Sequence, residues 1–497
     1  MTRLRAWLPA AAYVVVWLVL SSLAAAGFFL TSERTVDVAS HEARVTADFS
    51  GEVVVRTGPV LPDVRTDSGS PFGVQIELGK TDVRSLEDLT ARYAAIGSNP
   101  DAQVDKVGDA VREMLIDSVA RGLALGLVPL LVWRLLGEAR RREIVDHLPT
   151  RRGVAFLLVV AMVVIGLTTP WRGDQRRQPE RWTPLADFVG PEVDLPEELD
   201  DVEVLGPAGG GVQRLVASAI DSYGQGREFY ADAAEAAAEL PLRQPREGET
   251  VVLLLSDRHD NVGMDQVALA IAERGGAEAV FDAGDDTSTG EEWEAFSLDS
   301  LNEAFGDYDR WAVAGNHDHG SFVRSYLSDL GWTYFEDEVV DGPGGTRILG
   351  ADDPRSSGLG NWRDESGLSF DEVRSRIADT ACQADEDGER VDTLLVHDAN
   401  LGDDALARGC VDLVVGGHTH VQAGPRPVAG DNGDLGYTYT VGTAGGAAYA
   451  IAIGTKLRRA AGLALITYRD GQVAGIQSVT LETTGRFEVD PYEELRY

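Results

Sequence analysis

Short apolar runs recur through the second half of the chain, and each one is followed by Gly, Asp or His, directly or after a single Ser. Runs of this length that are rich in Val and Leu predict buried strands. We expect strands at residues 250–255, 279–281, 311–314, 394–396 and 413–415. Helical patterns separate several of them, at residues 264–274, 298–305, 322–330 and 370–381. This alternation predicts an α/β domain in which polar groups at the strand ends meet along one rim.

Three much longer apolar runs occupy the first third of the chain, at residues 7–30, 115–136 and 153–170. About 20 apolar residues span a bilayer as a helix, so we expect three membrane spans. For the first run the alternative is a cleaved signal peptide, since Ala24-Ala25-Ala26 offers small residues for cleavage, but the run is long for that purpose. For the other two runs the alternative is a pair of buried core helices.

Charge predicts the orientation of these spans. The loop at residues 137–152 carries five arginines, and short loops rich in Arg stay in the cytoplasm. Arg3 and Arg5 favour a cytoplasmic N-terminus. Residues 31–114 and everything after residue 170 would then lie outside the cytoplasm. Four arginines soon after residue 170 oppose this orientation, but long translocated domains override such charges.

The segments around the spans carry weaker patterns. Residues 36–55 largely alternate polar and apolar side chains, which indicates exposed strands. Helices are expected at residues 86–95, 104–114, 212–222 and 229–240, and the last residues of the chain are expected to be frayed. The predicted order begins with an N-terminal span (1–30), a small extracytoplasmic domain (31–114), a second span (115–136) and a basic cytoplasmic loop (137–152). It continues with a third span (153–170), a linker with accessory helices (171–249), the catalytic domain (250–485) and a tail (486–497).

Two cysteines, Cys382 and Cys410, are the only ones in the chain, and both lie in the catalytic region. In an oxidising compartment they would pair and bracket the strand at residues 394–396. Two unpaired thiols are the alternative, because sequence alone gives no distance between them. Their spacing does not match that of a metal site.

Six of the eight histidines fall within residues 256–420, in blocks that also contain Asp, Asn and Gly. The blocks directly follow the predicted strands. In an extended segment residues i and i+2 point the same way, so Asp257 and His259 share a face, as do His418 and His420. Clustering of this kind in a chain with little His elsewhere predicts a metal site.

The ordered set Asp-x-His, Gly-Asp, Gly-Asn-His-Asp, His and Gly-His-Thr-His resembles the calcineurin-like metallophosphoesterase superfamily, over roughly residues 250–445. The resemblance implies an α/β fold of two packed mixed β-sheets flanked by helices, here preceded by transmembrane helices. It implies one metal ion held by Asp257, His259, Asp285 and His420. A second ion would be held by Asp285, Asn316, His397 and His418, with Asp285 bridging the two.

The residue types suit this assignment. A carboxylate can serve two ions roughly 3.5–4 Å apart through its two oxygens. Imidazole combined with carboxylate and amide oxygen favours two divalent ions of Mn, Fe or Zn. The resemblance implies that a metal-bridging hydroxide attacks phosphorus in line. His317 would then protonate or stabilise the leaving oxygen, with Asp318 as a candidate orienting partner.

Residues that flank the motifs are candidate substrate contacts, namely Arg258, Asn261 and His319. Solvated surface positions are the alternative for Arg258 and His319. The chain also departs from many relatives in two places. The segment at residues 284–288 lacks the further acid or Asn that many relatives carry a few residues on, and His397 is followed by Asp398-Ala399-Asn400 instead of the frequent x-Pro. Neither departure removes a ligand, but both leave the substrate open.

These patterns together predict a multi-pass membrane protein whose extracytoplasmic domain hydrolyses a phosphate mono- or diester at the cell envelope. The substrate would be lipid-linked or envelope-associated, although a soluble nucleotide also fits a tethered enzyme. One alternative is a nuclease or cyclic-nucleotide phosphodiesterase, and the net charge of −37 disfavours nucleic acid. Another is a non-enzymatic binding or scaffold protein on the same fold, against which the complete ligand set argues.

Overall fold

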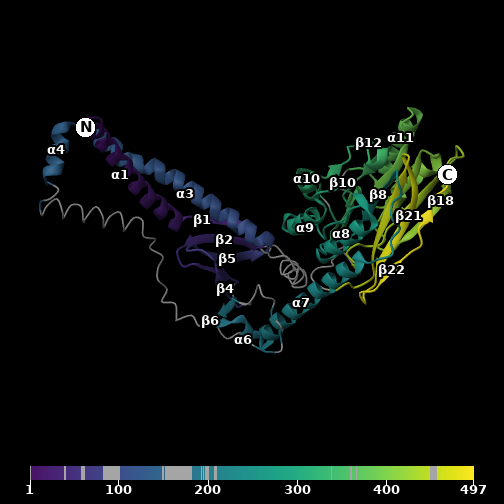
Figure 1. Cartoon of the computed structure of the whole chain (residues 1–497), viewed down its shortest axis with the longest axis horizontal. Coiled ribbons are helices and arrows are strands. Elements are labelled where there is room, and N and C mark those ends of the chain that lie inside the picture. Colours follow the sequence, from purple (N-terminus) through teal and green to yellow (C-terminus); the bar gives the residue numbers. More distant parts are fainter. Residues whose placement is uncertain are drawn as a thin grey trace. The chain divides into compact units, whose positions relative to one another are not determined.

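The computed structural model describes residues 2–38, 41–57, 62–81, 101–147, 150, 182–191, 193, 195, 201–205, 210–318, 320–336, 338–358, 361–364, 367–447 and 456–497. The chain forms two compact units (Figure 1). The first contains Met1–Asp82 and Gln103–Ser218, and the second contains Ala219–Tyr497. The division falls within helix α7 (Gly210–Ala238).

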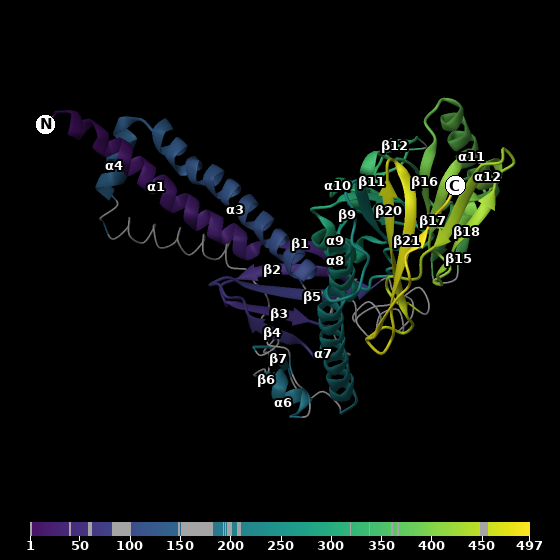
Figure 2. The same ribbon diagram turned by 45° about the vertical axis from the view of Figure 1, so that its right-hand side comes forward.

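The second unit consists of two β-sheets packed face to face with helices outside them (Figure 2). The first sheet has the order β11-β10-β9-β8-β20-β21-β22, with β23 also paired to β21. Its strands are β8 (Glu249–Leu255), β9 (Ala277–Asp282), β10 (Asp309–Ala312), β11 (Thr333–Tyr334), β20 (Ala461–Arg469), β21 (Gln472–Leu481), β22 (Phe487–Val489) and β23 (Glu493–Glu494). Strands β8 to β11 are parallel to one another, and β20 to β23 are antiparallel additions.

The other sheet has the order β12-β13-β16-β17-β19-β18. Its strands are β12 (Val340–Asp341), β13 (Arg347–Ala351), β16 (Val391–Val396), β17 (Val411–Gly416), β18 (Ala423–Ala429) and β19 (Leu435–Thr440). Strands β13, β16, β17 and β19 are parallel. A separate hairpin is formed by β14 (Arg355–Gly358) and β15 (Asn361–Asp364).

Helices cover the outer face of each sheet. The first sheet is covered by α8 (Gly263–Gly275), α9 (Ala295–Phe305) and α10 (Phe322–Asp329), and the second by α11 (Phe370–Glu386) and α12 (Asp403–Arg408). Short 3-10 helices lie at η2 (Glu292–Glu294), η3 (Pro343–Gly345) and η4 (Ala399–Gly402). Apolar side chains on the two inner sheet faces form the central core, to which β8 contributes Val252 and Leu254, both fully buried, while its Val251, Leu253 and Leu255 pack toward the helices. The predicted α/β architecture of two mixed sheets is confirmed.

The first unit has one mixed sheet and two long helices. The sheet has the order β1-β2-β5-β3-β4-β7-β6. Its strands are β1 (Glu33–Val38), β2 (His41–Asp48), β3 (Glu52–Arg56), β4 (Val64–Asp67), β5 (Gly73–Thr81), β6 (Trp182–Pro184) and β7 (Glu203–Leu205). The helices are α1 (Thr2–Thr31), α3 (Asp101–Leu135), α4 (Glu138–His147) and α6 (Leu185–Val189). Strands β6 and β7 come from the segment predicted as a linker, so that segment completes the small sheet.

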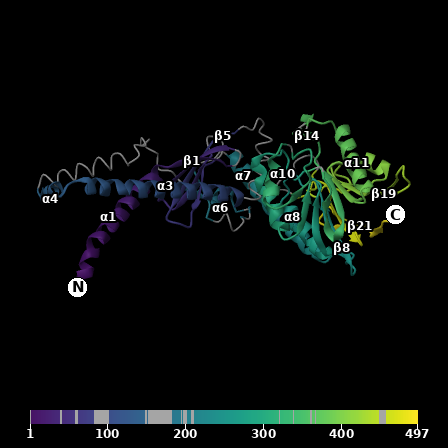
Figure 3. The same cartoon turned by 90° about the horizontal axis from the view of Figure 1, so that it is seen from above.

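Two of these helices contain stretches long and apolar enough to cross a membrane, Tyr13–Thr31 and Lys106–Leu135. They cross each other and diverge toward the N-terminus (Figure 3). At Gly122 an added Cβ would lie 2.7 Å from the Cβ of Ala25, and at Gly126 it would lie 2.2 Å from Ser21 Oγ. Contact this close needs glycine. The predicted third span at residues 153–170 and the predicted helix at residues 86–95 lie outside the described residues.

Two other expectations differ from the structure. The two helices predicted at residues 212–222 and 229–240 are one helix, α7. The tail is ordered and not frayed, because β22 pairs with β21 and Leu495 is only 6% exposed. The Asp470-Gly471 turn that joins β20 to β21 has φ values of 53° and 77°, the left-handed conformation that a tight hairpin requires.

Candidate metal centre

The predicted ligands gather at the carboxyl ends of five parallel strands. Strand β8 is followed by Asp257 and His259, and β9 by Asp285. Strand β10 leads to Asn316, β16 to His397, and β17 to His418 and His420. Parallel strands in packed sheets end on the same rim, so residues more than 160 positions apart in sequence become neighbours.

The backbone at this rim adopts a conformation that sequence patterns do not reveal. Among the described residues, seven that are not glycine have positive φ, and five of these are predicted ligands: Asp257, His259, Asp285, His418 and His420. A sixth is Asp260, beside them. Left-handed conformations cost about 1–3 kcal/mol each outside glycine and concentrate at functional sites. The rim therefore carries strain that the surrounding fold stabilises.

Close packing of the loops makes this strain persist. A Cβ added to Gly315 would lie 2.2 Å from Asp285 Oδ1, and one added to Gly417 would lie 2.3 Å from Asp257 Oδ2. Any side chain at either glycine would therefore displace a predicted ligand. This is the physical reason for glycine in the Gly-Asn-His-Asp and Gly-His-Thr-His motifs.

The first predicted ligand set is brought together closely. Asp257, His259, Asp285 and His420 each offer a ligand atom, and these atoms all lie within 4.8 Å of one another. His420 Nδ1 lies 3.0 Å from the carbonyl oxygen of Ala447 and can donate a hydrogen bond to it. In that tautomer His420 Nε2 carries a lone pair. That Nε2 is 3.0 Å from His259 Nε2 and 3.1 Å from Asp257 Oδ1.

Asp257 Oδ1 and His420 Nε2 thus face His259 Nε2 in a buried space. Asp257 Oδ1 is fully buried and has no hydrogen-bond partner in the described structure. Buried polar atoms without partners are costly, and converging lone pairs repel each other. A cation among them removes both penalties, so these residues fit a metal ion.

The second set shows the same pattern around Asp285. His397 Nδ1 lies 2.7 Å from the carbonyl oxygen of Ala283. Its Nε2 faces Asp285 Oδ2 at 3.2 Å and Asn316 Oδ1 at 3.1 Å. The ring of His418 lies against that of His397, with centroids 5.1 Å apart. The donor set of imidazole, carboxylate and amide oxygen again fits a divalent ion.

The electrostatics favour positive charge at both positions. Burial alone would raise the pKa of Asp285, but the surrounding histidines, His397 first, hold that pKa well below its usual range. Burial opposes charge on His397, yet Asp285 beside it raises the pKa of His397 well above its usual value. Burial lowers the pKa of His259 to about 3. The ionised Asp285 and the neutral His259 are in the protonation states that metal binding requires, whereas His397, with its raised pKa, would release a proton when a metal ion binds.

The two predicted catalytic residues lie in the same loop but make different contacts. The backbone N–H of His317 donates to Asp285 Oδ1 at 2.7 Å, and His317 Nδ1 lies 2.9 Å from the carbonyl oxygen of Ser288. Asp318 is buried and accepts from the backbone N–H groups of Asp285, Thr287 and Gly315. Asp318 therefore organises the backbone of Asp285, and the group that orients His317 is the Ser288 carbonyl.

The structure places two of the candidate substrate contacts, Arg258 and Asn261, in the protein interior. Arg258 is 2% exposed and donates to Asp265 at 2.9 and 2.7 Å and to Asp286 at 3.2 Å. This buried pairing does not fit contact with a substrate phosphate, nor a solvated surface position. Asn261 is also 2% exposed and donates to Tyr230 Oη and to the carbonyl oxygen of Gly445, both at 2.8 Å. His319 lies outside the described residues.

Sequence reasoning missed the groups that hold His317 in place. Ser288 donates to Asp260 from both its backbone N–H and its hydroxyl, at 3.0 and 2.5 Å. Glu294, fully buried, accepts from the backbone N–H groups of Ser288 and Thr289 at 2.8 and 2.9 Å. These contacts fix the Ser288 carbonyl that faces His317. An acid six residues beyond Ser288 carries no motif, so no sequence signal pointed to it.

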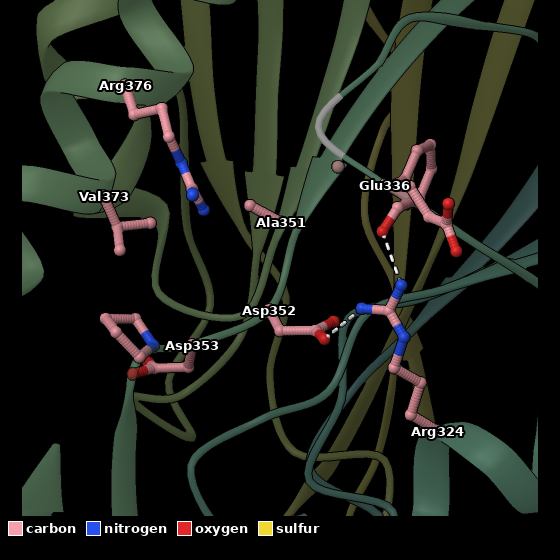
Figure 4. A pocket seen from close by; sticks show the side chains of 10 residues that line it. Arg324, Glu336, Ala351, Asp352, Asp353, Val373 and Arg376 are labelled. Carbon is pink, nitrogen blue, oxygen red and sulfur yellow. Dashed lines mark hydrogen bonds and ion pairs between the residues drawn. The ribbon is translucent and has the colours of Figure 1, made fainter. Parts of the chain in front are cut away.

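A pocket of about 230 Å³, lined by both charged and apolar side chains, lies beside Asp352, which contacts the loop that carries Asn316 (Figure 4). Asp352 on its floor accepts from the backbone N–H of Ala314 at 2.8 Å and from Arg324 at 2.6 Å. Arg324 also donates to the carbonyl oxygen of Phe335 at 2.7 Å. Arg376 points into the pocket from α11 (Figure 4). The pocket wall thus braces the loop two residues before a predicted metal ligand.

Comparison with known proteins identifies a family for this region. Residues 250–422 match the family model described as calcineurin-like phosphoesterase. A search of curated proteins finds no match. Distant similarities occur among solved structures, and their low scores leave the assignment resting on the family model.

Three of these structures are a dimetal phosphatase from Danio rerio, an archaeal phosphodiesterase and a protein of Thermus thermophilus. They are 12, 14 and 10% identical to this chain, with TM-scores of 0.33, 0.27 and 0.31. The alignments cover 49, 48 and 48% of this chain and 99, 99 and 98% of the respective structures.

Proposed function

We propose that the chain cleaves a phosphate mono- or diester at the cell envelope. The premise is that residues 250–422 are a calcineurin-like phosphoesterase domain and hence a phosphoester hydrolase. The observation that carries the proposal is the convergence of the predicted ligands of both sets on one rim, where the buried Asp257 Oδ1 of the first set has no hydrogen-bond partner. Asp285 stands between the sets and would bridge two divalent ions, of which Mn, Fe or Zn fit the donor atoms.

Two bound ions would activate a water molecule and neutralise charge on the phosphoryl oxygens. The contribution of the chain is to hold the metal ligands rigidly and to transfer a proton to the leaving group. His317 is fixed through its backbone N–H on Asp285 and through Nδ1 at the Ser288 carbonyl. This leaves Nε2 for proton transfer to the leaving oxygen, the role expected of a general acid.

Location at a membrane is supported by the exposed apolar surface of α1 and α3. Val15, Val19 and Leu23 on α1 are 58, 53 and 67% exposed, and Ile116 and Leu131 on α3 are 61 and 58% exposed. A water-soluble fold rarely leaves so many large apolar side chains uncovered on contiguous helices. Lipid would cover them.

The contact between the two helices has the character of packing in lipid. Gly122 and Gly126 are four residues apart on α3 and meet Ser21 and Ala25, also four apart, on α1. Small residues at this spacing let helices approach closely where van der Waals packing replaces the hydrophobic effect. Trp17 Nε1 donates to the carbonyl oxygen of Leu123 at 3.1 Å across the same contact.

Strand pairing supports a further crossing after α3. Val64 of β4 lies opposite Val204 of β7, and the backbone N–H of Leu205 donates to the carbonyl oxygen of Asp63 at 2.9 Å. Strand β4 precedes α3 and β7 follows it. If α3 crosses a membrane, the chain must return before β7 to reach the same sheet. The apolar run at residues 153–170 lies in that interval and supplies the third span.

The cysteine pair supports an extracytoplasmic catalytic domain. Cys382 at the end of α11 and Cys410 before β17 form a disulfide with a Cα–Cα distance of 4.9 Å. Disulfides persist in oxidising compartments outside the cytoplasm. With the arginine-rich loop inside, the phosphoesterase domain of our proposal lies outside.

The function is tested on the full-length chain in detergent with nitrophenyl phosphate mono- and diesters, supplied with Mn, Fe, Zn or no metal. Turnover that requires metal and is lost in Asn316→Ala and His418→Ala supports the proposal. A chain that binds none of these metals overturns it. Comparing a lipid phosphate, a cyclic dinucleotide and a nucleic acid as substrates then separates an envelope phosphatase from a nuclease or cyclic-nucleotide phosphodiesterase.

Orientation is tested separately with a reporter fused after Tyr497 that is active only outside the cytoplasm. An active reporter is expected. A reporter that works only in the cytoplasm and is active at this position would contradict the topology while leaving the chemistry intact.

A further inference from the structure

Two aromatic side chains form a small apolar surface on the sheet of the first unit. Phe49 follows β2 and is 54% exposed, and Phe72 precedes β5 and is 39% exposed. No other large apolar side chain is exposed among the described residues of β1 to β5 and the turns between them. The two ring centroids are 5.6 Å apart, so the turn after β2 and the turn before β5 present one joint surface, the Phe49–Phe72 surface.

This surface is continuous with the end of α1. The ring of Phe72 meets that of Phe29 edge to face, with centroids 5.7 Å apart and planes at 81°. Phe29 is 3% exposed and lies just before the end of the apolar stretch Tyr13–Thr31. Strand β2 lies beside the same end of α1 (Figure 2). The Phe49–Phe72 surface therefore stands at the height where α1 leaves its apolar stretch.

The packing of α3 against α1 shows what surrounds this height. The two helices are antiparallel, as two contacts show: Gly126 against Ser21 and Gly122 against Ala25. One turn further along each helix, Ser118 comes level with Phe29. Asp117, next to Ser118, pairs with Arg34 at 3.0 Å and with Arg121 at 3.6 Å. Charged side chains are costly within hydrocarbon, so this ion-paired group marks the headgroup region of a membrane around the helices.

We propose that the Phe49–Phe72 surface inserts into the extracytoplasmic leaflet, at the boundary between headgroups and acyl chains. The inference rests on the membrane location in the proposed function, because it takes α1 and α3 to be surrounded by lipid. It goes beyond that function by giving the small sheet a lipid contact of its own, separate from the spans. Aromatic side chains collect at this boundary, where apolar groups of a surface-bound element enter the leaflet without crossing it.

The two turns hold the rings in place for this contact. The backbone N–H of Ser50 donates to Asp48 Oδ1 at 2.8 Å, and Ser68 Oγ donates to the carbonyl oxygen of Phe72 at 2.7 Å. Because the turns are ordered before they meet lipid, the contact costs little conformational entropy. A sheet that touches the leaflet beside α1 is held at two places, which limits its tilt relative to the membrane.

Spin labelling of the full-length chain in phosphatidylcholine vesicles tests the contact. The two native cysteines are joined in a disulfide, so a single introduced cysteine can be labelled with a nitroxide. Phe49→Cys and Phe72→Cys place the label on the proposed contact. Electron paramagnetic resonance then measures the accessibility of the label to molecular oxygen, which concentrates in lipid, and to a nickel complex, which stays in water.

Two exposed positions of the same unit serve as references. Leu23→Cys, at a residue 67% exposed on α1, reports lipid, and Glu77→Cys, at a side chain 57% exposed on β5, reports water. Labels at Phe49 and Phe72 are expected to be reached by oxygen and protected from nickel, as at Leu23. Recovery of these chains in the membrane pellet is expected to equal that of the wild type, because the spans and not the turns hold the chain in the membrane.

Two results would overturn the inference while leaving the proposed function standing. Labels at Phe49 and Phe72 that nickel reaches as readily as the label at Glu77 would show that water covers the surface. Labels that neither reagent reaches would show that protein covers it. A label at Leu23 that behaves like the one at Glu77 would instead remove the membrane location from the proposed function.

Discussion

In the second unit, charged side chains lie where apolar ones are expected, and in the first unit apolar side chains lie where charged ones are expected. Asp257, His259 and Asp285 are at most 1% exposed, whereas Val15 and Leu23 are 58 and 67% exposed. Burying a charge without a partner costs several kcal/mol, and exposing an apolar stripe to water forfeits its hydrophobic stabilisation. In the function that we propose, each departure is relieved by something that the chain itself does not supply, a pair of cations in one unit and lipid in the other.

The two units therefore depend on their surroundings in ways that can be separated experimentally. Changes at the rim should alter metal binding and turnover without altering membrane insertion. Changes on the apolar faces of α1 and α3 should do the reverse.

The largest expected effect comes from the bridging position. Asp285→Asn removes the charge shared by both ligand sets, and the loss of metal stabilisation is expected to lower turnover about a thousand-fold, or about 4 kcal/mol. Initial rates with nitrophenyl phosphate at saturating Mn²⁺ measure it. The control is Asp379→Asn, which removes a carboxylate that is 71% exposed and paired to Arg408. A fall of less than about tenfold in Asp285→Asn would break the assignment of this residue as the bridge.

The next effect tests the other side of the comparison. Val19→Arg places a charge on the apolar stretch Tyr13–Thr31, where it is expected to cost about 2.5–3.5 kcal/mol of insertion free energy. The fraction of chain recovered in the alkaline-extracted membrane pellet measures it. Phe49→Arg is the control, because Phe49 is also exposed, at 54%, but follows β2 in the small sheet. Equal loss from the pellet in both variants would argue against lipid around α1.

Metal binding should stabilise the second unit specifically. If the folded rim binds cations as we propose, the unfolded chain would not hold the ligands together. Mn²⁺ at about 100 times its Kd is then expected to add about 2.7 kcal/mol per site. Differential scanning calorimetry with and without chelator measures the shift. A transition belonging to the first unit should not move. Equal stabilisation of both thermal transitions would contradict the expectation that metal ions stabilise only the second unit.

Glu249 is a buried carboxylate whose charge is balanced by arginines of the same chain, so it contrasts with the carboxylates of the rim. Burial alone would raise the pKa of Glu249, but bonds from Arg469, Arg246 and Arg243 lower it from 4.5 to about 2. Its contribution to stability is therefore complete above pH 4.5 and is lost as the pH falls toward 2. Glu249→Gln is expected to destabilise the second unit by about 2 kcal/mol at pH 7, less than a fully buried pair, because Arg469 is 40% exposed and screened by solvent.

Urea denaturation at about pH 7 and about pH 3 measures this effect. The difference between Glu249→Gln and the wild type should shrink at the lower pH, and chelator should not change it, in contrast to the rim carboxylates. A difference that grows as the pH falls would contradict the sign of the pKa shift.

Local sequence patterns determined a large part of this protein. The strands β8, β9, β10, β16 and β17 were predicted within a few residues, because a buried strand is an apolar run with clear ends. The motifs that follow those strands then placed Asp257, Asp285 and His397 on one rim, since parallel strands end together. The apolar stretches in α1 and α3 were equally visible.

Tertiary structure decided what depends on partners distant in sequence. The burial of Arg258, the role of Asp318 in organising the backbone of Asp285 and the pairing of Cys382 with Cys410 all follow from such contacts. The strand β7 looks like linker in sequence, because its three residues become a strand only beside β4. Left-handed backbone at five predicted ligands likewise cannot be recognised from residue types that normally avoid it. The periodicity of apolar residues indicates which face of a helix or strand is buried. Only the tertiary structure shows which residues bury it.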